Sequence, residues 1–278
     1  STQRRSEIRR ELERELRTFI ERLNELLDDA QARIQNKGRA GLVVIVDGLE
    51  KMVLLEHQPG PNSHERMFIH HAEQLQSPRC HLVYTVPISL LYNTNVQQVF
   101  GNSEVIPMGS VFQKDGTTFH KEGRDKLVEI IARRLDVGVI FPEQRGLLRL
   151  VELCGGHPGE LLRLVRFAFD YSENTVEPAA INRAVQKLVN DYDRLVKDSD
   201  LAALIRVHRE RRVSGDAHFA ELLHKLLVLE YNGERWADVH PAVRETARFR
   251  EALAKSQPKR AARRPAAGKK AAATKKPQ

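Results

Sequence analysis

The chain has 278 residues, of which 41% are hydrophobic and 29% charged, a balance that excludes a fibrous or fully disordered protein and predicts one large or two modest globular domains. It contains neither an apolar run of about 18 residues nor an apolar leader, so we expect neither a membrane protein nor a secreted one. The two cysteines, Cys80 and Cys154, lie far apart without a metal-binding spacing, which suits a reducing cytoplasm.

The net charge of +8 comes from the C-terminal end of the chain. Residues 255–278 hold nine Lys and Arg side chains and no acid, whereas the preceding 254 residues hold 36 basic and 37 acidic side chains. Because this tail has no large apolar residue, we expect it to be disordered and to bind polyanions with little specificity and a strong dependence on salt. It could equally serve as a solubilising appendage.

An amphipathic helix is predicted over residues 6–34. Apolar side chains recur there at spacings of three and four, and Gly38 and Gly41 end the pattern. The pattern lasts only about four heptads, which favours a helix packed on its own domain. Self-association through a coiled coil stays open as the alternative.

Two short aliphatic runs predict neighbouring strands of a parallel sheet. Residues 42–46 (LVVIV) end at Asp47, residues 81–86 (HLVYTV) end at Pro87, and a helix is expected between them over residues 63–76. Continuous hydrophobicity is typical of strands that are covered on both faces. A weaker run over residues 104–107 predicts a third strand.

Helical patterns dominate the remainder of the chain. They predict a separate helical subdomain with helices over residues 124–136, 142–154, 159–171 and 178–195, and then helices over 201–211 and 216–227. Asn232-Gly233 between strand-forming residues predicts a β-hairpin with Trp236 as its core anchor, followed by a last helix over 241–254. Two helices followed by a hairpin suggest a winged helix.

Asp47 is the first candidate functional residue. An acid that follows a buried parallel strand stands at the carboxyl edge of the sheet, where α/β proteins bind ligands. In phosphoryl-transfer proteins this acid holds Mg²⁺, usually through water. Glu50, three residues later, could reach the same site. A strand that ends in Asp-Gly is often no more than a turn, and that interpretation also stays open.

The blocks LVVIVDGLEK, HLVYTVPISLL and LCGGHPGELLRLVR resemble the AAA+ and STAND-type P-loop ATPases, particularly bacterial members with a winged helix after the lid. The resemblance covers about residues 42–250. It implies that the three blocks are Walker B, the sensor 1 strand and the sensor 2 region of the lid. Asp47 would then hold the magnesium ion, Thr85 would be the polar group that senses the γ-phosphate, and Arg163 would be the nearest candidate for the arginine that contacts the nucleotide.

The sequence departs from this family in three places. Gly48 replaces the acid that polarises water after the Walker B Asp, so Glu50 would have to substitute or hydrolysis would be slow. Arg163 lies one helical turn beyond the sensor 2 position of the family. Neither GxxxxGKS nor GxxxxGKT occurs, so the backbone N–H groups and the lysine that hold the β- and γ-phosphates are lacking.

We therefore expect ATP and Mg²⁺ to bind well only when a missing P-loop segment is supplied. Truncation at the N-terminus is the favoured explanation, because the sequence begins without Met and opens directly into a helix. A partner that supplies the missing half is the other explanation.

The expected fold class is α/β, with a partial parallel P-loop-type sheet. The expected domains are a partial core at 1–118, a helical lid at 119–197, a winged-helix domain at 198–254 and the basic tail at 255–278. The leading hypothesis is the C-terminal part of an AAA+/STAND-like ATPase that couples ATP state to conformational change. The alternative is a nucleotide-independent module that binds DNA or a partner protein through the winged helix and the tail. A third possibility is a degenerate ATPase that keeps the fold but not the chemistry, which Gly48 and Gly159 would allow.

Few residues are candidates for contact with nucleic acid. The second helix of the expected winged helix carries Lys225 as its only full positive charge, which makes a poor surface for phosphates. A better basic patch precedes it, comprising Arg206, Arg209, Arg211 and Arg212. Five histidines within residues 57–81 lack a metal-ligand spacing, and no nucleophile motif of a hydrolase occurs, so we expect neither a transition-metal site nor that chemistry.

Overall fold

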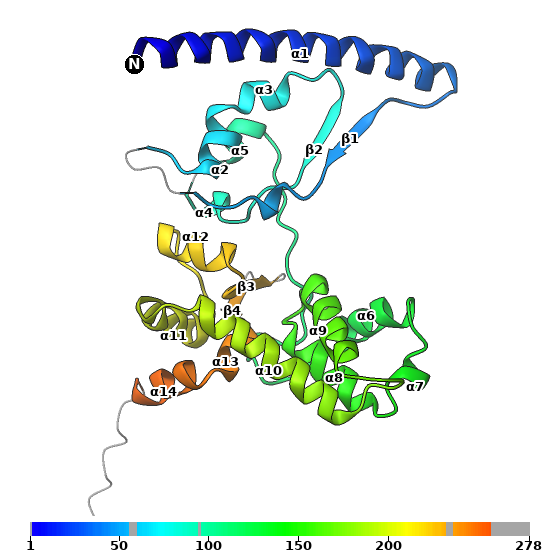
Figure 1. Cartoon of the computed structure of the whole chain (residues 1–278), viewed down its shortest axis with the longest axis vertical. Helices are drawn as coiled ribbons and strands as arrows, with labels where there is room; N and C mark the ends of the chain where they lie inside the picture. Colours follow the sequence, from blue (N-terminus) through cyan, green and yellow to red (C-terminus); the bar gives the residue numbers. More distant parts are fainter. Residues whose placement is uncertain (1, 56–59, 94–95, 232–235, 257–278) are drawn as a thin grey trace, which may run out of the picture.

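The computed structural model of the chain describes residues 2–55, 60–93, 96–231 and 236–256. Figure 1 shows three groups of elements in chain order: a long helix over a two-stranded sheet, a group of packed helices, and helices around a β-hairpin. The fold is thus a mostly helical α/β fold with a small parallel sheet and a small antiparallel hairpin. The Asn232-Gly233 turn and the tail beyond Ser256 lie outside the described residues.

The first group is an N-terminal α/β unit. It comprises α1 (Thr2–Asn36), β1 (Val43–Val46), a 3-10 turn (Leu49–Lys51), α2 (Ser63–Glu65), a π turn (Arg66–His70), α3 (Ala72–Gln76), β2 (His81–Tyr84), α4 (Leu90–Asn93) and α5 (Val96–Phe100). The helix that we predicted over residues 63–76 is therefore divided by the π turn. Asn62 caps its start, because the Asn62 side chain accepts the N–H of Glu65.

The two predicted strands are parallel neighbours, as expected. Val43 pairs with His81 and Val46 with Tyr84. The prediction that both faces are covered is wrong: the side chains of Val43, Ile45 and Val83 are 56%, 67% and 49% exposed. Alternate residues of a strand point to opposite faces of a sheet. Among the described residues, no element covers the face to which Val43, Ile45 and Val83 point.

The predicted third strand over residues 104–107 does not form. Ile106 is 85% exposed, and at Met108 the chain instead contacts the antiparallel sheet of the C-terminal hairpin. The Met108 N–H donates to the carbonyl of Glu230, and Met108 forms an isolated parallel bridge with Tyr231. Because Pro107 lacks a backbone donor, this segment is poorly suited to a full ladder of hydrogen bonds.

Helix α1 rests on the α/β unit through its C-terminal half. Asn24, which is 7% exposed, donates to the carbonyl of Ser77 and accepts the N–H of Arg79. Arg79 also forms an ion pair with Asp28, and Leu27 is buried. Every described side chain from residue 4 to residue 19 is exposed.

Five helices form the second group. They are α6 (Lys121–Ala132), α7 (Val137–Ile140), α8 (Gln144–Leu153), α9 (Pro158–Asp170) and α10 (Pro178–Leu195). Proline stands at the first turn of α9 and α10, where its missing N–H costs nothing. The His157 side chain caps α9 by accepting the N–H of Glu160.

The third group surrounds an antiparallel hairpin. It contains a 3-10 turn (Asp198–Asp200), α11 (Leu201–Glu210), α12 (Ala217–His224), β3 (Val228–Tyr231), β4 (Trp236–Val239), α13 (Pro241–Glu245) and α14 (Ala247–Lys255). Trp236 is 6% exposed and stacks on Tyr231 with ring centroids 4.2 Å apart, in agreement with its predicted role as an anchor. The predicted last helix is divided at Thr246, which caps α14.

The second and third groups share one hydrophobic core. A single cluster of buried side chains runs from Leu127 in α6 through Leu188 in α10 to Val243 and Phe249 in α13 and α14. The expected boundary at residue 197 therefore crosses continuous packing. Among the described residues, no helix combines the length and apolarity that crossing a bilayer requires.

His240 makes the free energy of unfolding of this shared core depend on pH. The imidazole is fully buried, stacks on Tyr192 at 4.1 Å and accepts the N–H of Ala242. Burial is the main cause that lowers the pKa of His240 from 6.5 to about 3. Between these two values the unfolded chain binds a proton that the folded chain does not, so stability falls as the pH drops through this window.

We predict that His240→Asn flattens the acid dependence of stability. Asn keeps an acceptor for the Ala242 N–H but does not titrate, so the loss of unfolding free energy between pH 6.5 and 3 decreases by up to about 1.4 kcal/mol per pH unit. Urea unfolding at several pH values measures this slope. Equal slopes in both proteins would contradict the role given to His240.

Candidate functional site

Asp47 lies where β1 ends, at the carboxyl edge of the sheet. Its side chain is exposed, and Oδ1 accepts the N–H of Gly48 at 2.8 Å. Gly48 has a φ of +87°, a conformation that glycine adopts without the strain of a side chain, and the chain then enters the 3-10 turn Leu49–Lys51. The turn brings Glu50 back toward the end of the neighbouring strand.

Glu50 and Thr85 form a hydrogen-bonded pair at the same edge. The Thr85 hydroxyl donates to Glu50 Oε2 at 2.6 Å and accepts the N–H of Leu49 at 3.2 Å. The Thr85 N–H donates to the carbonyl of Val46, which fixes Thr85 directly beyond the strand pair. The hydroxyl is the main cause that lowers the pKa of Glu50, assisted by the charge of Lys51 and opposed by partial burial.

The structure thus places Asp47, Glu50 and Thr85, three residues that the sequence analysis selected, at one edge of the sheet, where a hydrogen bond joins Thr85 to Glu50 and Asp47 is bonded to Gly48. Two of them are carboxylates, and Mg²⁺ is commonly held by one or two carboxylates together with water and substrate phosphates. No group of three or more His, Cys, Asp or Glu side chains suited to a metal exists in the described part of the chain. The donor set fits a hydrated ion that takes its other ligands from a phosphate, rather than an ion enclosed by protein.

Arg163 is held inside the helical group. Its guanidinium donates to Glu160 Oε1 at 3.4 Å and to Asp191 of α10, and it lies over the ring of Phe167. These contacts do not join it to Asp47. At the start of α9, burial lowers the pKa of His157, the charge of Glu160 opposes this shift, and the charge of Lys51 makes a smaller contribution in the same direction as burial.

Gly156, the second of the two glycines before α9, has a steric role that the sequence did not reveal. Gly156 has a φ of +87°, and a Cβ there would lie 1.7 Å from the carbonyl oxygen of Gly109. The two backbones touch, because the Gly109 N–H donates to the carbonyl of Gly156 at 3.0 Å. The sequence indicated only that the helix breaks here, since the contact joins residues that are distant along the chain.

The five candidate residues for nucleic acid are not equally accessible. Arg212 is exposed, Arg209 is bonded to Ser256, and Arg206 is paired with Glu210. Two others are largely taken up by acids: Lys225 forms an ion pair with Glu221, and Arg211 forms one with Asp238. The structure therefore does not present them as one basic surface.

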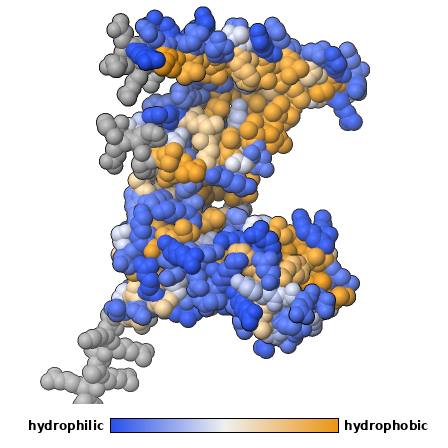
Figure 2. Space-filling view, viewed as in Figure 1, coloured by the Kyte–Doolittle hydropathy of each residue, from blue (hydrophilic) through white to orange (hydrophobic). Residues whose placement is uncertain are grey.

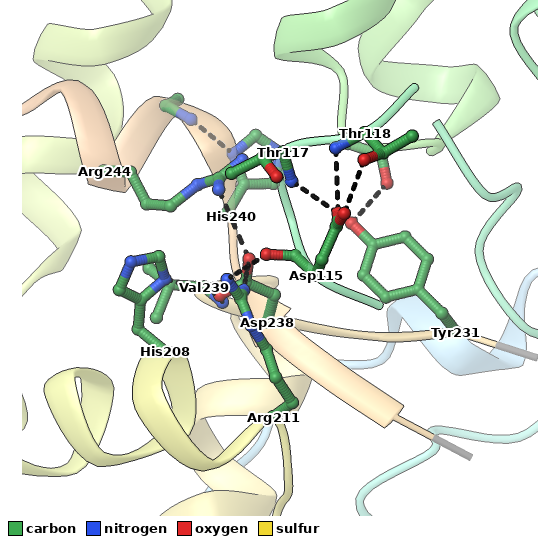
Figure 3. A network of polar contacts seen from close by, with 12 residues as sticks. Asp115, Thr117, Thr118, His208, Arg211, Tyr231, Asp238, Val239, His240 and Arg244 are labelled. Atoms are coloured by element: carbon green, nitrogen blue, oxygen red, sulfur yellow. Dashed lines mark hydrogen bonds and ion pairs between the residues drawn. The ribbon is translucent and has the colours of Figure 1, made fainter. Parts of the chain in front are cut away.

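Asp238 is the centre of a buried ion cluster that the sequence analysis missed (Figure 3). Its side chain is 5% exposed and contacts His208 at 2.8 Å, Arg211, and Arg244 at 3.3 Å. Arg211 also donates to the carbonyl of Asp115, so the cluster joins α11, β4 and α13 to the loop before α6. An acid within the apolar run of β4 was the only available signal.

Comparisons of the chain with protein-family models, curated proteins and solved structures found no match.

We predict that Thr85→Val raises the pKa of Glu50 toward its ordinary value. The variant keeps the branched shape of the side chain but removes the hydroxyl that stabilises the ionised carboxylate. A carbon-13 NMR titration of the Glu50 carboxyl group measures the change. Thr18→Val is the matched control, since it removes the same hydroxyl from an exposed threonine of α1 that is bonded to Arg14 and not to Glu50. A Glu50 titration that Thr85→Val leaves unaltered would contradict this pairing.

Proposed function

We propose that the chain is the Walker B to winged-helix part of an AAA+/STAND-like ATPase, which couples ATP state to conformational change. The convergence of Asp47, Glu50 and Thr85 at the carboxyl ends of two adjacent parallel strands carries this proposal. That edge is where open α/β sheets bind their ligands. In this interpretation residues 119–197 are the lid and residues 198–254 are the winged helix.

The incomplete sheet supports the same proposal. Parallel sheets are normally covered on both faces, yet Val43, Ile45 and Val83 are exposed here, and the two strands have no further neighbour in the described residues. A segment that carries the P-loop would add strands beside this pair and cover the open face. It would also supply the backbone N–H groups and the lysine that the triphosphate needs.

The three residues would have distinct roles with Mg·ATP bound. Asp47 would hold the magnesium ion through water, and Thr85 would keep Glu50 ionised and fixed in place. A carboxylate with a lowered pKa is a weak proton acceptor, so Glu50 is better suited to orienting water than to deprotonating it. This favours slow hydrolysis, in keeping with Gly48 at the position of the usual acid.

The test uses a longer chain extended upstream until it includes a GxxxxGKS or GxxxxGKT loop. We predict that the extended chain binds Mg·ATP while the 278-residue chain does not. In the extended chain, Asp47→Asn should weaken binding in the presence of Mg²⁺ by at least about ten-fold, because the ion loses its anionic anchor. Isothermal titration calorimetry with and without Mg²⁺ measures both effects.

A matched control is Asp136→Asn, which removes an acid that caps α7, away from the sheet. It should leave Mg·ATP binding unchanged. An extended chain that fails to bind Mg·ATP, or that is indifferent to Asp47→Asn, would refute the ATPase assignment.

The charge of the tail favours a second function, the binding of DNA or another polyanion. The nine cations of residues 255–278 have no acid among them, whereas Arg211 and Lys225 are occupied by acids of their own unit. Non-specific affinity for DNA depends on the number of phosphates that cations neutralise. We therefore assign it to the tail.

We predict that a chain ending at Ser256, which keeps only Lys255 of these cations, loses most of its affinity for duplex DNA. The combined variant Arg209→Ala and Arg212→Ala should lose far less. Fluorescence anisotropy at several salt concentrations compares the two, and only the tail deletion should flatten the dependence on salt. The opposite ranking would place the interface on α11 and the residues that directly follow it.

A further inference from the structure

Helix α1 carries an apolar surface that its own chain leaves open. Figure 2 shows hydrophobic colour along the lower side of α1 and continuing onto the sheet. The exposed side chains on the helix include Leu12, Leu16, Phe19 and Leu26, at 64%, 41%, 61% and 65% exposure. A contiguous apolar patch of this kind marks an interaction site.

These residues belong to a heptad pattern. Leu12, Leu16, Phe19, Leu23, Leu26 and Ala30 follow one another at alternating spacings of four and three residues. We call this row the outer row. The inner row beside it, made of Ile20, Asn24, Leu27, Gln31 and Ile34, is half-buried or buried, whereas in the outer row only Leu23 and Ala30 are half-buried and the others are exposed. The helix therefore has one row packed on its own domain and an adjacent row with coiled-coil spacing, of which Leu12, Leu16, Phe19 and Leu26 are exposed.

The two halves of α1 differ in what they contact. The described side chains up to residue 19 are all exposed, whereas Asn24, Leu27 and Asp28 hold the C-terminal half to its own domain. A second helix running antiparallel would place its free N-terminal half along the supported C-terminal half of the first. The two α/β units would then lie toward opposite ends of the helix pair.

The charges beside the outer row distinguish the antiparallel registers. With Leu16 opposite Phe19 of a second copy, Glu15 faces Arg22 of that copy, and symmetry repeats this attractive pair. If the second helix slides by one heptad so that Glu15 meets Glu15 of the other copy, two negative charges face each other. If it slides by one heptad the opposite way, Arg22 meets Arg22 and Glu15 meets Asp29, so that every facing pair has like charges. Only the first register joins opposite charges.

A parallel arrangement lacks this complementarity. Glu15 and Arg22 would then lie beside Ile20 and Leu27 of the other copy, and these two side chains belong to the inner row. Charges beside apolar groups gain nothing from the contact. The charge pattern therefore favours the antiparallel pair.

We propose that two copies of this chain associate through an antiparallel pairing of α1, with Leu16 of each copy against Phe19 of the other and Glu15 against Arg22. The occupant of the outer row is thus a second copy of the same helix. The proposal is independent of the ATPase assignment, since it uses no residue of the nucleotide site.

Charge reversal in the 278-residue chain tests the register. Sedimentation equilibrium from low to high micromolar concentration should show a monomer–dimer equilibrium for the unaltered chain. Glu15→Arg alone and Arg22→Glu alone each place like charges together twice per dimer, and each should raise the dimer Kd by at least about ten-fold. The double variant with both changes restores opposite charges and should return the Kd to near its original value.

Glu25→Arg is the matched control. It makes the same change of charge on an exposed position of the same helix, outside both rows, and should leave the dimer Kd unchanged. Far-UV circular dichroism of each variant checks that α1 remains helical. A chain that stays monomeric throughout, a dimer that is indifferent to the single reversals, or a double variant that stays dissociated would each overturn the proposal.

Discussion

The parallel pairing of β1 with β2 is the constraint on which the candidate site depends. Val46 and Tyr84 are the last paired residues, so Asp47 and Thr85 follow side by side at one edge. The Thr85 N–H extends the ladder to Val46, which leaves its hydroxyl free to bind Glu50 as the chain turns back through Gly48. A slip of one residue would point Thr85 to the opposite face and separate it from Glu50. The site therefore follows from the register of four residue pairs.

The molecule divides into a closed part and an open part. The helices from α6 to α14 enclose one continuous core, in which Leu150, Leu188 and Leu204 are fully buried. The α/β unit has a smaller cluster centred on Phe68, Leu90 and Val96, and it leaves one face of its sheet and the outer row of α1 exposed. Because burial of apolar surface is the dominant favourable term in folding, a partner that covered these two surfaces would stabilise the open part.

The sequence predicted those strands and helices that are determined by the local pattern of apolar residues. Aliphatic runs located both strands and placed Asp47 at the edge, and periodicity located most helices to within a few residues. It could not predict that the sheet is open on one side, since hydrophobicity reports that a face is apolar and not what covers it. The ion pair of Arg211 with Asp238 and the contact of Gly156 with Gly109 also escaped prediction, because each joins segments that meet only in the folded chain. The prediction of a strand over residues 104–107 was wrong because it relied on the apolar side chains of this run and gave too little weight to Pro107, which lacks the backbone N–H that a strand needs.

The central claim is that the edge formed by Asp47, Glu50 and Thr85 holds a divalent ion for a triphosphate. Paramagnetic broadening by Mn²⁺, used in place of Mg²⁺ with ATP on the P-loop-bearing longer chain, tests it most directly. Our account requires the amide signals of Gly48, Leu49 and Val86 to broaden strongly when Mn·ATP is added, and signals in α12 and α14 to stay sharp. Broadening centred on another part of the molecule, with these three amides unaffected, would contradict it.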